Sequence, residues 1–316
     1  MATMKRTLNT GQRIARRLST ALLIWFALVS PLYAANLAVL YPDAPPPYKQ
    51  VFDQLIDGIE QHHDDRLVRY PLEKTFDPRS VIRQLERDQV DMVVTLGRRG
   101  YSLLPELEGR FPHVIGALPL TPNGEKSGVS LINDPDNLFL QLGRLAPQIK
   151  RVSVVYTNRS RWLIQLARAS AKKRGLTLTE YKVDTLAEAV RQYEDVLDQV
   201  DPQTDAIWLP LDKITANEKV ILPMLLREAW EKRIVVFSSK PSHVKRGTLF
   251  SIYPNNQQSG ERLAEMVKDL FTNRSVPGIE PSRSMHLGVN LRTAVHLGLE
   301  YAPAMKRSFY RTYPQP

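Results

Sequence analysis

The sequence predicts an α/β protein built from two lobes, each a doubly wound parallel sheet, joined by a hinge. Three observations support this prediction. Short apolar segments alternate with amphipathic helical segments from residue 36 onward, which is typical of parallel sheets covered by helices on both faces. The alternation occurs in two successive series. A stretch rich in Pro, Gly and Ser at residues 121–128 separates the two series.

The first series contains four short apolar runs that end at turn residues and are therefore expected to be buried strands. These strands cover residues 36–41, 67–72, 91–96 and 113–118. Between them, apolar residues at helical spacing predict helices over 48–62, from Asp77 onward, and over 101–107.

The second series is longer and has clearer helix ends. Asn133 and Asp134 are good caps for a helix over 135–146, and Gly175 ends a helix that begins at Trp162. Residues 302–316 are expected to form a loose tail. The remaining helices are expected at 185–200, 221–232 and 258–271, and the strands at 151–156, 177–183, 206–210, 234–237, 248–252 and 284–291.

Residues 1–35 have the composition of a secretory signal peptide. Five Lys and Arg residues and no acid precede an apolar run at 21–29, a helix-breaking Pro31 and the small residues Ala34 and Ala35. The apolar run is about half the roughly 20 residues that a spanning helix needs. We expect cleavage after Ala34 or Ala35 and export to the periplasm, with an uncleaved membrane anchor as the alternative.

The charge and the absence of Cys exclude several classes of protein. The full chain has a formal charge of +10, but without the leader 38 basic and 33 acidic residues remain, which gives +5. A nucleic-acid-binding function is therefore not indicated. With no Cys in the chain, lipoprotein anchoring, thiol catalysis and Cys-ligated metals are excluded.

We expect the ligand site where the carboxyl ends of the strands meet loops, because ligands of parallel sheets collect there. Gly97, Arg98 and Arg99 follow a predicted strand and precede a helix, so backbone amides and a guanidinium would form a carboxylate or phosphate site. A solvated loop is the alternative for these residues. Tyr41 and Asp43 lie at the end of the first strand, where a Pro-rich turn is the alternative explanation.

Strand ends of the second series supply further candidates. Ser238 and Ser239 offer hydroxyl donors, or form an ordinary strand-to-helix turn. Asp212 would hold a ligand amine or cap the next helix. Asn158 and Ser160 precede a helix and are interpreted first as its amino-terminal cap.

Tyr253 and Trp208 are two further aromatic residues to place. Tyr253 lies near an expected hinge crossing and either lines the pocket or packs against its neighbours. Trp208 lies inside a strand and is interpreted as a core residue.

Four segments from about residue 128 onward carry a resemblance to a known family. They are residues 149–156, 204–212, 234–249 and 289–299, the last reading Val-Asn-Leu-Arg-Thr-Ala-Val-His-Leu-Gly-Leu. In order and spacing they resemble the substrate-binding proteins of ABC transporters, in the group with tryptophan- and tyrosine-type binders. The resemblance implies a type I periplasmic binding fold, with lobe 1 formed by residues 36–129 and 249–282 and lobe 2 by 130–248 and 283–301.

Two segments depart from the pattern of that family. The family has an aromatic run before its late helix, where this chain has Asn255, Asn256 and Gln257. It has small residues after an early strand, where this chain has Gly97 to Gly100 with two arginines. The pocket is therefore expected to be more polar and more cationic than that of an aromatic amino acid binder.

We predict a periplasmic solute-binding protein that captures a small polar, anionic or amino-acid-like ligand and presents it to an ABC permease. It is expected to be a monomer without metal, cofactor or nucleic-acid partner. An enzyme is not expected, because no phosphate-binding loop, nucleophile elbow or metal-binding His spacing is present. The alternatives are a periplasmic ligand sensor that signals to a membrane receptor, and a periplasmic hydrolase.

Overall fold

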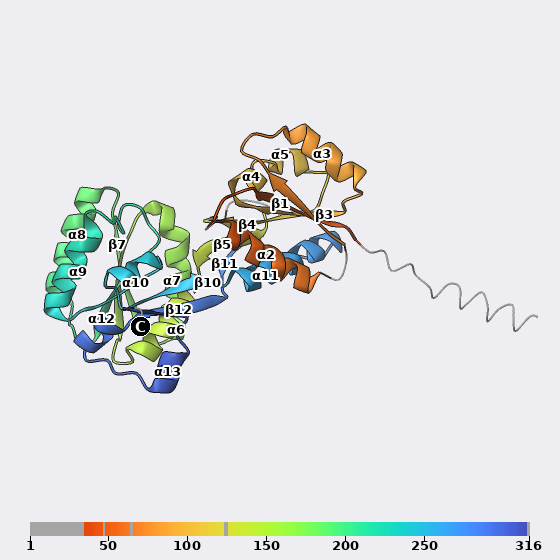
Figure 1. Cartoon of the computed structure of the whole chain (residues 1–316). Coiled ribbons are helices and arrows are strands. Elements are labelled where there is room, and N and C mark those ends of the chain that lie inside the picture. Colours follow the sequence, from red (N-terminus) through yellow and green to blue (C-terminus); the bar gives the residue numbers. More distant parts are fainter. Residues whose placement is uncertain (1–34, 47, 64–65, 123–125, 315–316) are drawn as a thin grey trace, which may run out of the picture. The chain divides into compact units, whose positions relative to one another are not determined.

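The computed structural model describes residues 35–46, 48–63, 66–122 and 126–314 of the chain (Figure 1). The predicted leader therefore lies outside the described residues, apart from Ala35. Within the described ranges, no helix has both the length and the apolar character needed to cross a membrane. The described residues form two mainly parallel sheets with flanking helices, which confirms the predicted α/β class.

The first sheet contains six strands in the order β11-β5-β4-β3-β1-β2. Every neighbouring pair in it is parallel, so the carboxyl ends of its strands lie along one edge. All four strands predicted for the first series are present. The six strands are β1 (Leu37–Pro42), β2 (Leu67–Leu72), β3 (Met92–Leu96), β4 (His113–Leu118), β5 (Gly128–Asn133) and β11 (Ile279–Ser282).

The second sheet contains seven strands in the order β13-β12-β10-β9-β8-β6-β7. Its pairs are parallel except for β10 and β12, which run antiparallel. The strands are β6 (Arg151–Tyr156), β7 (Thr177–Lys182), β8 (Asp205–Leu209), β9 (Val235–Ser238), β10 (Phe250–Pro254), β12 (Met285–Asn290) and β13 (Arg311–Tyr313).

The long helices lie where the apolar spacing predicted them, and their ends carry the expected signals. Asp134 caps α6 by accepting a hydrogen bond from the Asp136 N–H, and Gly175 adopts a φ of 67° just after α7. The longer helices are α2 (Tyr48–His62), α3 (Pro78–Arg87), α6 (Pro135–Leu145), α7 (Arg161–Lys173), α8 (Leu186–Gln199), α9 (Ile221–Lys232) and α11 (Asn256–Phe271). The short ones are α4 (Gly97–Tyr101), α5 (Leu104–Leu107), η1 (Asn158–Ser160), α10 (Ser242–Arg246), α12 (Leu291–His296) and α13 (Pro303–Arg307).

Helices α2 and α11 lie side by side against the first sheet (Figure 1). Their backbones approach so closely that a Cβ atom on Gly260 would lie 2.0 Å from the carbonyl oxygen of Leu55. A Cβ atom on Gly58 would lie 1.9 Å from the carbonyl oxygen of Gln257. Glycine is therefore required at both crossing positions.

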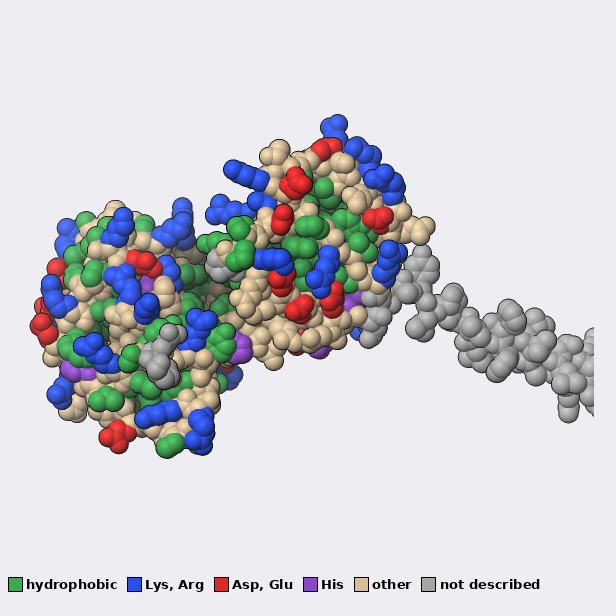
Figure 2. Space-filling view, viewed as in Figure 1, with side chains coloured by type: hydrophobic (Ala, Val, Ile, Leu, Met, Phe, Trp, Pro, Cys, Tyr) green, Lys and Arg blue, Asp and Glu red, His purple; other side chains and the backbone are tan. Residues whose placement is uncertain are grey.

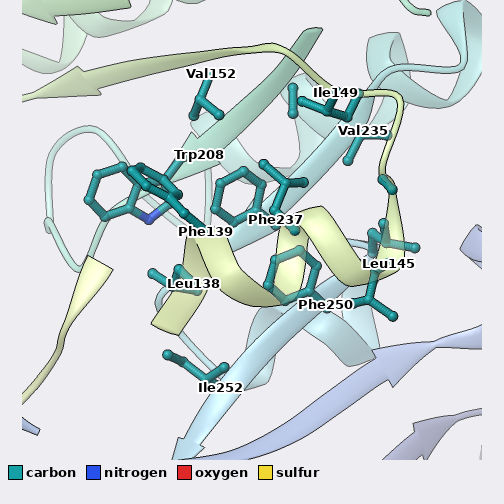
Figure 3. Packing of buried hydrophobic residues seen from close by; sticks show 14 of the residues in the cluster. Leu138, Phe139, Leu145, Ile149, Val152, Trp208, Val235, Phe237, Phe250 and Ile252 are labelled. Carbon is teal, nitrogen blue, oxygen red and sulfur yellow. The ribbon is translucent and has the colours of Figure 1, made fainter. Parts of the chain in front are cut away.

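The side chains of the second sheet alternate between two cores, as expected for strands covered on both faces. In β8, Trp208 joins the cluster that includes α6 and α7, whereas Ile207 joins the cluster under α8 and α9. Figure 3 shows the first cluster, in which Phe139 meets Trp208 edge-on at a centroid distance of 5.7 Å. Trp208 is fully buried, which confirms its interpretation as a core residue.

The strands β5 and β10 do not follow the expected division of the chain. β5 pairs with β4 in the first sheet, although lobe 2 was expected to begin at residue 130. β10 pairs with β9 and β12 in the second sheet, although residues 249–282 were expected in lobe 1. The apolar pattern identifies buried strands, but backbone pairing decides which sheet each one joins. The chain still passes between the sheets three times, and the division into lobes stays a prediction.

The carboxyl-terminal segment packs on the second sheet over residues 302–314, so the expectation of a loose tail is wrong for its described residues. Its described residues contain α13 and β13, and β13 pairs in parallel with β12. The N–H of Tyr310 donates to the carbonyl oxygen of Leu287 at 2.8 Å. Phe309 is buried and meets Tyr301 edge-on at 5.7 Å, which supplies the apolar anchor that holds the segment on the sheet.

Candidate functional site

Five of the predicted site residues lie at the carboxyl edge of the first sheet. Tyr41 is near the end of β1 and Asp43 follows it. Gly97, Arg98 and Arg99 begin α4 directly after β3, the neighbour of β1. The order of the strands thus brings these two loops together.

The two arginines after β3 have different surroundings. The Arg99 guanidinium donates to the carbonyl oxygens of Asp43 and Leu72, at 2.7 Å and 2.6 Å, so it holds the loops after β1 and β2 in place. Arg98 is exposed, and its side chain makes no hydrogen bond or ion pair within the described residues. Of the two cations, Arg98 is the one with N–H groups free for an anion.

Gly97 and Asp43 are the other two candidates at this edge of the first sheet whose surroundings bear on ligand binding. Gly97 has a φ of 66°, and a Cβ atom there would meet the Pro42 ring at 3.0 Å, so glycine is required where the chain turns into α4. The Asp43 carboxylate is exposed, and no partner for it is found in the part of the chain described here.

At the edge of the second sheet, Asp212 joins the loops after β6 and β8. One of its carboxylate oxygens accepts hydrogen bonds from the Thr157 hydroxyl at 2.5 Å and from the Ser160 hydroxyl at 3.1 Å. The other accepts from the N–H groups of Ile214 and Thr215, at 2.9 Å and 3.2 Å. Asp212 therefore caps the turn that follows it, which was the alternative to a direct contact with a ligand amine.

The pKa of Asp212 reflects this arrangement. Burial alone would raise the pKa, because it disfavours the charged carboxylate. The hydrogen bonds from the Thr157 hydroxyl and from three backbone N–H groups outweigh burial and hold the pKa below its usual value. The carboxylate thus stays ionised and keeps its partners at neutral pH.

Asn158 and Ser160 lie in η1, between β6 and α7. Ser160 occupies the cap position of α7, but its hydroxyl donates to Asp212 instead of accepting from the helix. Asn158 is exposed and its side chain has no hydrogen bond within the described residues. Sequence reasoning did not select Arg159 and Arg161, which are exposed and likewise make no ion pair in the described ranges. Their positions in the segment that follows β6 were the available signal.

Ser238 and Ser239 end β9 beside these loops, but both hydroxyls are buried and engaged within the protein. The Ser239 hydroxyl accepts from the Trp208 indole N–H at 2.9 Å. The Ser238 hydroxyl accepts from the Lys240 N–H at 3.0 Å. These residues hold the turn after β9, which favours the structural alternative that the sequence left open.

Ser238 also lies 2.8 Å from the Nδ1 atom of His243, a contact between a hydroxyl and an imidazole that the sequence did not predict. Both side chains are completely buried. Burial, with a contribution from Lys240, lowers the pKa of His243 to about 4. No substrate can reach this pair. Within the described residues, no group of three His, Cys, Asp or Glu side chains is placed to hold a metal ion.

Asn133 has a different role from the helix cap that the sequence predicted. It was expected to help start α6, but it ends β5, and its amide donates to the carbonyl oxygens of Ser239 and Ile252, at 3.2 Å and 3.5 Å. The end of a strand in the first sheet is thereby tied to strands β9 and β10 of the second.

Tyr253 is not part of the strand-end group. Its hydroxyl lies 3.1 Å from that of Tyr313, and the Arg311 guanidinium carbon lies 5.5 Å from the centre of its ring. Tyr253 lines a different cavity, on the flank of the second sheet. The sequence placed it near a hinge crossing, but the direction of the side chain depends on β13, which was not predicted.

The polar stretch Asn255 to Gln257 holds α11 in place. Asn255 caps α11 by accepting from the Gln258 N–H at 3.1 Å. Asn256 donates to Gln54 at 2.8 Å and Gln257 donates to Gln61, both in α2. We expected these residues to form a polar pocket wall, but in the structure they form a polar contact between two helices.

Comparisons with known proteins agree with this fold. A family model described as ABC transporter substrate binding protein matches residues 75–308. The structure of an ABC domain in complex with L-Trp from Streptococcus pneumonia is similar at a TM-score of 0.51 and 19% identity, covering 88% of this chain and 99% of that one. No curated protein sequence matches this chain.

A second similar structure is the ligand-free, open form of a substrate binding protein with adhesive properties from Clostridium difficile. Its TM-score is 0.61 at 17% identity, and the match again covers 88% of this chain and 99% of that one. At such identities the likeness shows a shared fold, which confirms the predicted type I periplasmic binding architecture. Because the family model spans well over half of the chain, this protein belongs to the ABC transporter substrate binding protein family, whose members bind solutes and are not enzymes.

Proposed function

We propose that this protein is the periplasmic binding component of an ABC-type uptake system and that its ligand is a small polar molecule with a carboxylate or phosphate group. Two lobes close on the ligand by a hinge motion, exclude water and present the complex to a membrane permease. The predicted leader directs the chain to the periplasm. Family membership supports the role in solute binding.

The main support for an anionic ligand is that exposed guanidinium groups lie in strand-end loops of both sheets. Arg98 follows β3 in the first sheet, and Arg159 follows β6 in the second. Both side chains lack a hydrogen bond or ion pair within the described residues, in contrast to that of Arg99. A guanidinium with free N–H groups binds a carboxylate or phosphate through two parallel hydrogen bonds.

Other free polar groups in the same loops suit a ligand that also carries an amine. The Asp43 carboxylate is exposed after β1 and provides a partner for an ammonium group. Tyr41 adds a ring near the end of β1 in the first sheet, and Asn158 adds an amide after β6 in the second. Asp212 acts as a positioning residue, because one carboxylate oxygen is occupied by the loop that carries Asn158 and Arg159 and the other by the turn after Asp212 itself. An amino acid satisfies this combination of charges.

A thermal-shift screen of the purified protein tests this function. The compounds are amino acids, beginning with the L-Trp of the similar Streptococcus structure, then small carboxylates and phosphate esters. A ligand at 100 times its Kd raises the free energy of unfolding by about 2.7 kcal/mol. If no compound of these three classes stabilises the protein, the proposed ligand chemistry is wrong.

Arginine variants test the site itself. We expect Arg98→Gln and Arg159→Gln each to weaken binding of the identified ligand at least tenfold in calorimetric titrations. Arg87→Gln is the matched control, because Arg87 is an exposed arginine at the end of α3, outside the strand-end loops. Unchanged affinity in both site variants would contradict a cationic site.

A further inference from the structure

A second cavity lies on the flank of the second sheet, bounded by α9, α10, α12 and β13. Its volume is about 1100 Å³, and of the predicted site residues only Tyr253 lines it. Five cationic side chains and one carboxylate face it: Arg227, Lys245, Arg246, Arg292, Arg311 and Glu231.

Most of this positive charge is not neutralised. Arg227 contacts the Glu228 carboxylate at 3.1 Å, and Arg246 donates to the carbonyl oxygen of Glu218 at 3.1 Å. Lys245 is exposed and has no hydrogen bond or ion pair within the described ranges. Cations that line one hollow without matching acids repel one another, and a bound anion relieves that repulsion.

Aromatic rings hold two of the guanidinium groups over the cavity. The Arg292 guanidinium carbon lies 5.4 Å from the centre of the Trp230 ring. The Arg311 guanidinium carbon lies 5.5 Å from the ring centres of both Tyr253 and Tyr310. Contact with an aromatic ring restrains a guanidinium but leaves N–H groups at its edge to donate hydrogen bonds to an anion.

The floor of the cavity is braced by hydrogen bonds between α10 and the start of α12. The Asn290 amide donates to the carbonyl oxygen of Val244 at 2.8 Å, and the Thr293 hydroxyl donates to that of Gly247 at 3.0 Å. Since these contacts are made within the protein itself, little ordering is needed on binding. In Figure 2, Lys and Arg side chains are spread over the visible face of the part that contains the second sheet.

We propose that this cavity binds a small, multiply charged anion, whose carboxylate or phosphate groups contact Arg292, Arg311 and Lys245. Ligand cavities commonly measure about 300 to 1,000 Å³, so this hollow accommodates a molecule of the size of citrate together with bound water. This site goes beyond the proposed function, because it lies outside the strand-end loops that would hold the transported solute.

Calorimetric titration of the purified protein with citrate and with inorganic pyrophosphate tests the proposal. We expect at least one of the two to bind, with the affinity falling as salt is added. Binding of citrate alone identifies a polycarboxylate site, and binding of pyrophosphate alone a phosphate site. The double variant Arg292→Gln with Arg311→Gln should weaken binding at least tenfold.

Two further variants guard against effects on folding and on total charge. Lys245→Gln changes only an exposed side chain and should weaken binding at least threefold with an unchanged Tm. The control, Arg87→Gln with Lys172→Gln, removes two exposed cations elsewhere and should bind like the wild type.

Three outcomes would overturn the proposal. The first is that neither anion binds, including the case in which an acidic peptide binds instead, which would make this surface a protein-docking site. The second is that the double variant binds as tightly as the wild type. The third is that the control weakens binding as much as the double variant, which would indicate a diffuse charge effect.

Discussion

The Asp212 carboxylate binds both the hydroxyl and the backbone N–H of Thr157, at 2.5 Å and 3.2 Å. Thr157 follows β6 and Asp212 follows β8, and these strands are neighbours in the second sheet. The contact therefore joins two loops at one edge of the sheet. The shape of this part of the proposed ligand site depends on one ionised side chain.

We expect Asp212→Asn to lower the free energy of unfolding by about 2 kcal/mol, because hydrogen bonds to a buried charge contribute about 1.5 to 3 kcal/mol each and an amide has only one acceptor oxygen. Urea unfolding measures the change. Asp195→Asn removes an exposed carboxylate from α8 and should stay within about 0.5 kcal/mol of the wild type. Equal stability of the two variants would show that the network contributes little.

His243 predicts a loss of stability in acid. Its pKa is lowered to about 4 in the folded protein, against about 6.5 in an unfolded chain, so between these values the unfolded state binds more protons. Stability is therefore complete above pH 6.5 and falls as the pH drops towards 4. The shift corresponds to about 3 kcal/mol at most.

Unfolding in urea at pH 7.5 and pH 4.5 measures this loss. The variant His243→Asn removes the titrating group, so the difference between the two pH values should shrink relative to the wild type. A wild-type protein with the same stability at both pH values would contradict the buried neutral imidazole.

The fold could be predicted from the sequence wherever the signal is local. The run from Ala206 to Leu209 is apolar throughout and bounded by turn residues, and it forms β8. β11 and β13 could not be predicted in this way. β11 has four residues including Pro281, and β13 has three, so each is a strand only because a neighbouring strand pairs with it.

The sequence was enough to place the candidate residues at strand ends, but not to predict their contacts. The order of strands and loops was enough to place Arg98 and Arg99 at a strand end. Nothing in the sequence distinguishes the two arginines, because the carbonyl groups that engage Arg99 come from the ends of other strands. The contact of Ser238 with His243 likewise depends on α10, a helix of five residues without a clear sequence signal.

Two helix glycines, one at the crossing of α2 and α11 and one away from it, should respond in opposite ways to substitution by alanine. Gly260→Ala places a methyl group against the Leu55 carbonyl and should lower the free energy of unfolding by about 1 to 3 kcal/mol or more. Gly143→Ala lies in α6 with nothing within 4 Å and should raise it by about 0.5 to 1 kcal/mol. Urea unfolding of both variants checks the signs, and a neutral Gly260→Ala would disprove the tight crossing.

The ordered carboxyl-terminal segment predicts that residues beyond 302 contribute to stability. Phe309 is buried against Tyr301, so Phe309→Ala should lower the free energy of unfolding by about 3 kcal/mol, through lost burial and the cavity left behind. The neighbouring ring of Tyr310 is half exposed, at 50%, and Tyr310→Ala should cost much less. Urea unfolding compares the two variants. A loose tail would make both substitutions neutral. A Phe309→Ala protein as stable as the wild type would therefore show that the tail is loose and that β13 is not part of the sheet.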